Sequence, residues 1–172
     1  MKIFSPMTRN DASVLLDAYS LKILLELQRD ARQTVAQLSA AVGLSPTPCW
    51  KRVKELEAAG VITGYRATVN LQKLGYGIRA IIRAGRAEYA RVVKLVQQTP
   101  EVVNAYNVTG EDSWIIEIAV LDVAHLDAVV TRFCMLTETS TSIILNPLRE
   151  HQGMLPPRRE DVKPPIKKVE NA

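Results

Sequence analysis

The chain has few cysteines, few aromatics and no long apolar run, and each shortage excludes a class of protein. Only two cysteines occur among 172 residues, and they lie far apart, so neither a disulfide framework nor a cysteine-based zinc site is predicted. Cys49 and Cys134 are both expected to be small buried residues. No apolar run approaches the roughly 18 residues that a membrane-spanning helix needs. The N-terminus also lacks the apolar stretch of a secretory signal, so we expect a cytoplasmic protein.

Patterns typical of catalysis are missing as well. The sequence contains neither a Gly-x-Ser-x-Gly turn nor a phosphate-binding glycine loop. His125 and His151 have no partner at metal-ligand spacing, and His125 is expected on the outer face of a helix. The adjacent carboxylates Glu111 and Asp112 follow Gly110 in a predicted turn, where such pairs are usually solvated. We therefore predict no enzyme activity, no metal and no cofactor.

Positive charge is concentrated in the first part of the chain. The net charge is +4 overall, with +4 in residues 1–75, −2 in residues 76–150 and +2 in residues 151–172. A basic front joined to a slightly acidic middle indicates two domains with different partners. The basic part is the candidate for binding a polyanion such as double-stranded DNA, although a charge of this size also fits an ordinary surface.

Residues 15–64 are predicted to form three helices. Asp17 can cap the first, whose apolar residues recur at helical spacing. Thr34 and Gln37 fit a capping box at the start of the second, and Gly43 ends it in a left-handed conformation. Ser45 can cap the third, which continues to Gly60. A helix, a tight glycine turn and a second helix predict a helix-turn-helix DNA-binding domain.

The third helix is expected to have one buried and one exposed face. Cys49, Val53 and Leu56 share the buried face, and Arg52 lies near its edge, free to bind a phosphate or to pair with Glu55 or Asp30. The other face offers a hydroxyl, two ammonium groups and an indole that could stack on DNA or pack on another subunit. A solvated amphipathic helix is the alternative. The candidate DNA contacts are Thr34, Ser45, Pro46, Thr47, Trp50, Lys51, Arg52 and Lys54.

Residues 78–150 read as a second domain. Alternating and helical periods predict strands over 78–84, 102–108, 114–120 and 140–145, with helices between them from residue 89 and from residue 123. This βαββαβ order predicts an α+β fold of the ferredoxin-like type, with helices on one face of the sheet only. Isoleucines on both faces of the third strand suggest that a second subunit covers the other face, which predicts a dimer.

The remaining segments are assigned as connections. Residues 1–14 are an N-terminal arm, and residues 65–77 are a linker that begins within a short strand over 61–70 and ends in a glycine-containing hinge. Residues 151–172 hold four of the nine prolines and are expected to be a flexible basic tail.

Several motifs together resemble the Lrp/AsnC family, also called leucine-responsive or feast/famine regulators. The similarity spans about residues 15–148. Its more specific part covers the predicted helix-turn-helix: Leu38, Val42-Gly43-Leu44-Ser45, Arg52-Val53, Leu56-Glu57, Gly60-Val61-Ile62 and Gly64-Tyr65. A second part lies in the second predicted domain, residues 78–150: Val108-Thr109-Gly110-Glu111, Trp114-Ile115-Ile116 and Thr139–Leu145.

The resemblance implies a transcription regulator that forms dimers through the sheets of its second domain. It also implies that these dimers form larger assemblies such as octamers, and that an amino acid or related metabolite binds between subunits. Ser113 stands where the family usually has an aspartate, which would suit an ammonium group. An effector-independent architectural DNA-binding protein, or a small-molecule-binding oligomer with a minor DNA role, are the alternatives. The effector region implied by the resemblance comprises Gly110, Glu111, Asp112, Ser113, Trp114, Thr139 and Thr141.

Overall fold

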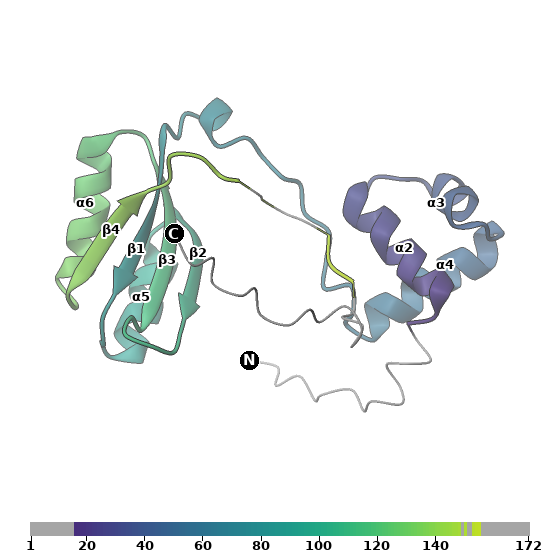
Figure 1. The fold of residues 1–172 in the computed structure, drawn as a ribbon, viewed down its shortest axis with the longest axis horizontal. Coiled ribbons are helices and arrows are strands. Elements are labelled where there is room, and N and C mark those ends of the chain that lie inside the picture. Colours follow the sequence, from purple (N-terminus) through teal and green to yellow (C-terminus); the bar gives the residue numbers. More distant parts are fainter. Residues whose placement is uncertain (1–15, 149, 151–152, 156–172) are drawn as a thin grey trace, which may run out of the picture. The chain divides into compact units, whose positions relative to one another are not determined.

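The computed structural model describes residues 16–148, 150 and 153–155, which form two compact units (Figure 1). One unit contains residues 16–66 together with 153–155, and the other contains residues 67–148 and 150. The expected N-terminal arm and most of the expected flexible tail lie outside the described residues. We describe each unit by itself.

The first unit is a three-helix domain built as the sequence predicts. Helix α2 spans Ala18–Arg29, α3 spans Val35–Val42 and α4 spans Pro46–Ala58. Asp17 caps α2, Thr34 and Gln37 form the full capping box of α3, and Gly43 ends α3 at a φ of 79°. The core between the helices is aliphatic, with one cysteine: Ile23, Leu24, Leu38, Val42, Cys49, Val53 and Leu56.

The cap of α4 differs from the expectation. Ser45 occupies the N-cap position, but its side chain makes no capping hydrogen bond. The reason lies in the two prolines that follow. An N-cap hydroxyl usually accepts from the N–H of the second or third helical residue. The third is Pro48, which has no N–H, so Ser45 loses one of its two usual donors. Helix α4 therefore begins at Pro46 without a side-chain cap.

The strand expected over residues 61–70 is not formed. Residues 63–70 belong to no helix or strand, and Gln72–Leu74 form a short 3₁₀ helix, η1. Alternating apolar residues indicate a strand only where a neighbouring strand supplies hydrogen bonds, and within the described residues no strand pairs with this segment. Gly75 follows η1 at a φ of 95°, at the expected hinge.

The second unit is a four-stranded antiparallel sheet with two helices on one face. Strands β1 (Ile78–Ala84), β2 (Val102–Asn107), β3 (Trp114–Val120) and β4 (Thr139–Ile143) lie in the order β2-β3-β1-β4. Helices α5 (Tyr89–Gln98) and α6 (Val123–Cys134) pack on the sheet (Figure 1). Val92 of α5 and Val129 and Phe133 of α6 share one core with Ile116 and Ile118 of β3. The βαββαβ order predicted from the sequence is confirmed.

The open face of this sheet is more polar than β3 alone suggested. Ile115 faces outward beside Tyr106, as strand alternation predicts, and Ala119 is 2% exposed. However, β1 contributes Arg79 and Arg83 to the same face. Arg79 pairs with Glu117 of β3 and with Glu150, so an ion-pair network crosses the middle of the face. The uncovered apolar surface is therefore smaller than expected.

Two further expectations for this unit are wrong. Cys134 is exposed rather than buried, because it is the last residue of α6 and points to Thr139, with 2.8 Å between its Sγ and the Thr139 Oγ1. His125 is partly buried rather than on an outer surface. Its Nε2 lies 2.9 Å from Glu101 Oε1, and Arg132 approaches the other oxygen of the same carboxylate at 3.2 Å. Burial alone would raise the pKa of Glu101, but these contacts hold it below its ordinary value.

Candidate DNA-binding and effector sites

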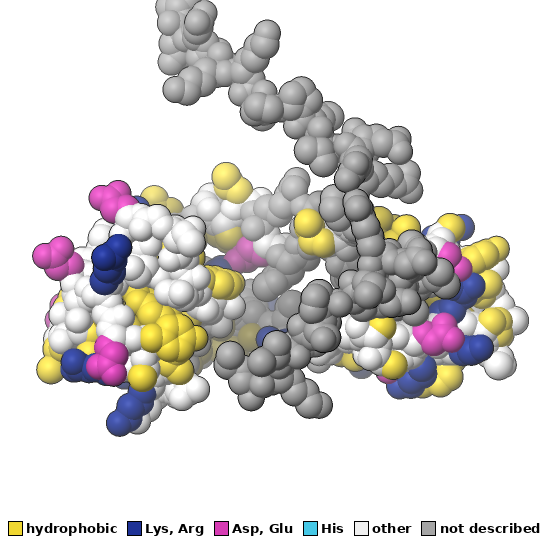
Figure 2. All heavy atoms as spheres, turned by 90° about the horizontal axis from the view of Figure 1, so that it is seen from below, with side chains coloured by type: hydrophobic (Ala, Val, Ile, Leu, Met, Phe, Trp, Pro, Cys, Tyr) yellow, Lys and Arg dark blue, Asp and Glu magenta, His cyan; other side chains and the backbone are white. Residues whose placement is uncertain are grey.

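The exposed face of α4 carries the four side chains expected there. Thr47, Trp50, Lys51 and Lys54 are all exposed, whereas Cys49, Val53 and Leu56 are buried. Lys51 lies 3.8 Å from Glu55, and Lys54 lies 2.7 Å from Glu57 and 4.4 Å from the centre of the Trp50 ring. On the face of the molecule drawn in Figure 2, lysines and arginines likewise lie among acidic residues rather than forming a patch of one sign.

Arg52 pairs with neither of the partners expected from the sequence. Its Nη1 lies 2.6 Å from Asp17 Oδ2 and donates to Ser20 Oγ at 3.2 Å. Burial would raise the pKa of Asp17, but hydrogen bonds from Ser20 and Arg52 hold it below its ordinary value. Arg52 therefore ties α4 to the start of α2 across the core. This contact joins residues far apart in the sequence, so no local pattern could indicate it.

The other candidate DNA contacts lie at helix starts. Thr34 Oγ1 accepts from the N–H of Gln37 at 3.2 Å, so this hydroxyl is engaged in the capping box of α3. Ser45 and Pro46 are exposed at the start of α4, beside Thr47. A hydroxyl without a cap bond at a helix N-terminus remains available to an anion such as a phosphate.

Tyr65 is a contact residue that the sequence reasoning did not single out. It lies seven residues beyond α4, and its hydroxyl donates to Glu57 Oε1 at 3.0 Å. Partial burial, and then the hydrogen bond and charge of Glu57, raise the pKa of Tyr65 to about 12. Hydrogen bonds from Lys54 and Tyr65 in turn lower the pKa of Glu57. Glu57 therefore links the segment after α4 to a cation of its exposed face.

We expect one tyrosine to ionise late. The pKa of Tyr65 is higher in the folded chain than the ordinary value of 10.0, so its hydrogen bond stabilises the fold below pH 10 and is lost as the pH rises through about 12. An absorbance titration at 295 nm should show this late component, and Tyr65→Phe should remove it. Glu57→Gln should shift it to lower pH. A late component of full size in Tyr65→Phe would show that another tyrosine is responsible.

The loop between β2 and β3 contains the front part of the predicted effector region. Gly110 adopts a φ of 123°, which favours glycine, and Glu111 is exposed, whereas Asp112 and Ser113 are half-buried. Ser113 is fixed through its backbone. Its N–H donates to Ala84 O at 3.0 Å, and its carbonyl accepts from Val108 N and from Asn107 Nδ2, both at 2.9 Å. The loop is thus anchored to β1 and β2 at Ser113.

The remaining effector candidates lie on the sheet, on its helix-covered face. Strand register places Asn107, Trp114, Ala84 and Thr139 in one row across the four strands, and Thr141 in the next row. Trp114 is 6% exposed, its ring lies 5.4 Å from that of Tyr89, and its buried indole N–H has no partner among the residues that the structure describes. Ala84 lies between Trp114 and Thr139 in this row, so β1 separates β3, which follows the loop, from β4.

Within residues 16–148, 150 and 153–155, no group of three or more His, Cys, Asp or Glu side chains is placed to hold a metal ion. In the same residues, no helix is long and apolar enough to cross a membrane.

Comparison with known proteins identifies both units. Residues 16–63 match a family model described as winged helix-turn-helix DNA-binding, and residues 80–154 match the Lrp/AsnC ligand binding domain. The glutamate uptake regulatory protein of Zymomonas mobilis is 32% identical over 149 residues, which cover 82% of this chain and 90% of that protein. The leucine-responsive regulatory protein of Rhizobium meliloti is 36% identical over 135 residues, covering 76% and 86%.

The fold comparison agrees. A transcriptional regulator of Neisseria meningitidis, solved in complex with L-Met, superimposes with a TM-score of 0.76 at 29% identity, covering 81% of this chain and 96% of that one. A helix-turn-helix unit joined to a ligand-binding sheet unit defines a DNA-binding transcriptional regulator. The chain belongs to the Lrp/AsnC family of such regulators.

Proposed function

We propose that α4 enters the major groove of double-stranded DNA and reads the sequence there. The observation that carries this proposal is the exposed face of α4, which presents Thr47 and Trp50 to base edges and Lys51 and Lys54 to phosphates. Ser45 and Pro46 would lie against the backbone at the helix start, with Thr34 nearby. Arg52 would act mainly by holding α4 on α2. Contacts to phosphates position a protein on DNA, whereas contacts to base edges give specificity.

Removing Lys51 or Lys54 tests this assignment. Lys51→Ala and Lys54→Ala are each expected to weaken binding to all duplex sequences and to lower the slope of log K against log salt by about one unit per lost phosphate contact. Thr47→Ala and Trp50→Ala should instead alter sequence preference. Lys73→Ala, in η1, is the control and should leave the slope unchanged. Tight, salt-sensitive binding that survives the loss of all four side chains of α4 would contradict the proposal.

We also propose that the sheet unit binds an amino acid or a related metabolite between subunits. The unpartnered indole N–H of Trp114 supports this, because a buried donor without an acceptor is costly and a ligand oxygen could satisfy it. Gly110, Glu111, Asp112 and Ser113 would form one wall. Thr139 and Thr141, which lie apart from this loop in one chain, would contribute from the edge strand. The L-Met complex of the Neisseria regulator is consistent with a ligand of this class.

Ser113→Asp tests which ligands suit this wall. A neutral hydrogen bond contributes about 1 kcal/mol and a charge-assisted one about 1.5–3 kcal/mol, so an ammonium group binds a carboxylate better than a hydroxyl. Calorimetry with a panel of amino acids should therefore show binding to Ser113→Asp that is about ten-fold or more tighter than to the native chain. The control is Ser142→Asp, on the exposed edge strand. Micromolar binding of an ordinary amino acid to the native chain, unchanged in Asp112→Ala and Glu111→Ala, would contradict the charge argument.

The remaining proposals concern the oligomeric state and the cellular location of the protein. We propose a homodimer that pairs the open faces of two sheets, with further assembly into a larger ring such as an octamer. The uncovered pair of Ile115 and Tyr106 on that face supports the dimer. We further propose that the protein acts in the cytoplasm, on the nucleoid, without catalytic activity.

A further inference from the structure

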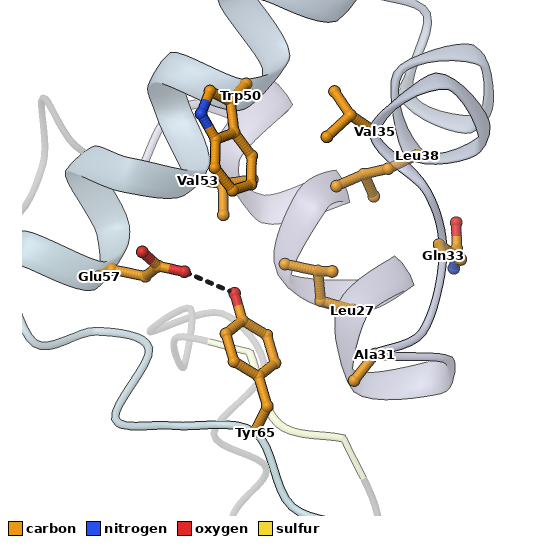
Figure 3. A pocket seen from close by; sticks show the side chains of 9 residues that line it. All are labelled: Leu27, Ala31, Gln33, Val35, Leu38, Trp50, Val53, Glu57 and Tyr65. Carbon is orange, nitrogen blue, oxygen red and sulfur yellow. Dashed lines mark hydrogen bonds between the residues drawn. The ribbon is translucent and has the colours of Figure 1, made fainter.

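The DNA-binding unit has a pocket of about 150 Å³ with no assigned role (Figure 3). Aliphatic side chains from α2, α3 and α4 line one part of it. Two aromatic rings line another, Trp50 from the exposed face of α4 and Tyr65 from the segment after it. Two of the lining side chains are polar, Gln33 and Glu57, and Glu57 accepts a hydrogen bond from Tyr65. The lining comprises Leu27, Ala31, Gln33, Val35, Leu38, Trp50, Val53, Glu57 and Tyr65.

A second observation places residues 153–155 on α2, at the residue that follows Leu27 of the lining. The side-chain amide of Gln28 makes two hydrogen bonds with the backbone of Met154. Gln28 Nε2 donates to the Met154 carbonyl at 2.9 Å, and the Met154 N–H donates to Gln28 Oε1 at 2.6 Å. Gly153 packs so closely here that a Cβ would lie 3.3 Å from Gln28 Cβ. Gln28 is next to Leu27 of the pocket lining, and Figures 1 and 3 both show residues 153–155 beside the segment that carries Tyr65.

The residues that follow this anchor have the composition that an aromatic-lined pocket binds. Pro156 and Pro157 come directly after Leu155, and Pro164-Pro165-Ile166 follows within about 30 Å of extended chain. Proline-rich sequences favour the polyproline II conformation, which needs no internal hydrogen bonds and loses little entropy on docking. Such segments bind grooves lined by aromatic side chains. Their lack of N–H groups suits a pocket whose walls offer few acceptors.

The charges agree with this pairing. Residues 156–166 hold three Lys or Arg and two Asp or Glu, so this segment has a net charge of +1, and Glu57 places a carboxylate in the pocket lining. We propose that the proline-rich segment 156–166 of this chain docks in the pocket formed by Trp50, Tyr65 and the ends of α2 and α4. Because Trp50 belongs both to the pocket and to the exposed face of α4, docking also sets the orientation of this indole.

Nuclear magnetic resonance on the full chain tests the proposal. The chain has two indole N–H signals, which Trp50→Phe assigns. Changing Pro156, Pro157, Pro164 and Pro165 together to serine should move the Trp50 signal and leave the Trp114 signal in place. A synthetic peptide of residues 156–172 should move the Trp50 signal of this variant back. The same peptide should bind the native chain at least ten-fold more weakly, because the tethered segment competes for the pocket.

Two exposed alanines provide the matched variants. Ala31→Lys, made in the four-serine chain, places bulk and positive charge at the pocket and should weaken peptide binding at least ten-fold. Ala36→Lys, on α3 outside the lining, should not. The proposal is overturned if the four serines leave the Trp50 signal in place or if the peptide binds both lysine variants equally. It is also overturned if the signal depends on protein concentration, which indicates a second copy, or on deletion of residues 1–15, which indicates the N-terminal segment.

Discussion

Replacing Phe133 by alanine is expected to lower the free energy of unfolding of the sheet unit by about 3–5 kcal/mol. Phe133 is 2% exposed and packs from α6 into the core that contains Ile116 and Ile118. Alanine would leave a cavity that the surrounding strands can fill only in part. The helix-turn-helix unit has a separate core, so its stability should stay unchanged.

Urea unfolding at fixed protein concentration measures this effect unit by unit. One tryptophan lies in each unit, so a Trp50→Phe background lets Trp114 report the sheet unit alone. Met135→Ala is the control, since Met135 is 79% exposed two residues further on and its loss should change stability by less than about 0.5 kcal/mol. A loss below about 1 kcal/mol for Phe133→Ala would mean that this core does not hold the sheet unit together.

Ile115→Arg is expected to convert the dimer to a monomer. Ile115 lies on the open sheet face, on the inner strand β3, where it pairs with Tyr106, and it would be buried when two such faces pair. The substitution would bury two like charges, each without a carboxylate nearby, because Glu117 is already bound to Arg79. Light scattering should then give a mass near the 19.1 kDa of a single chain instead of twice that mass or more.

The control introduces the same arginine side chain on the opposite, helical side of the sheet unit. Val123→Arg, at the start of α6, places the same side chain at a position that is 67% exposed on the helical side of the unit. This variant should remain dimeric. An unchanged mass for Ile115→Arg, with the native chain dimeric, would show that the two sheets do not pair through their open faces. Circular dichroism of both variants checks that the unit stays folded.

Most elements of the fold could be predicted because their signals are local. Asp17, Thr34 and Gln37 mark helix starts by short-range hydrogen bonds, and Gly43 ends a helix by its own conformational freedom. Strands β1 and β3 could also be predicted, because each has one buried face, which requires apolar residues at every second position. The segment at 61–70 shows the same alternation, but it forms no strand because no neighbouring strand supplies hydrogen bonds to it.

The contacts that shape the candidate sites were harder to predict because they join distant residues. Arg52 meets Asp17 across the core, Tyr65 returns to Glu57, and Met154 reaches Gln28 from the far end of the chain. No periodicity encodes such pairs. The uncapped start of α4, by contrast, has a local cause: Pro48 removes an N–H that Ser45 would normally cap, and the sequence alone contains that information. The exposed quartet of α4 also follows directly from helical geometry.

Each of the three cations of α4 already has a carboxylate partner in the free chain: Lys51 has Glu55, Arg52 has Asp17 and Lys54 has Glu57. A phosphate that binds one of them competes with a protein carboxylate for the same cation, in addition to releasing its own counterions. Part of the electrostatic gain on any duplex is therefore offset. If these cations bind phosphates as proposed, random genomic DNA is expected to hold α4 less tightly than it would hold three free cations, which shortens each stop during the search for an operator. Base contacts then carry a larger share of the discrimination between the operator and the rest of the genome.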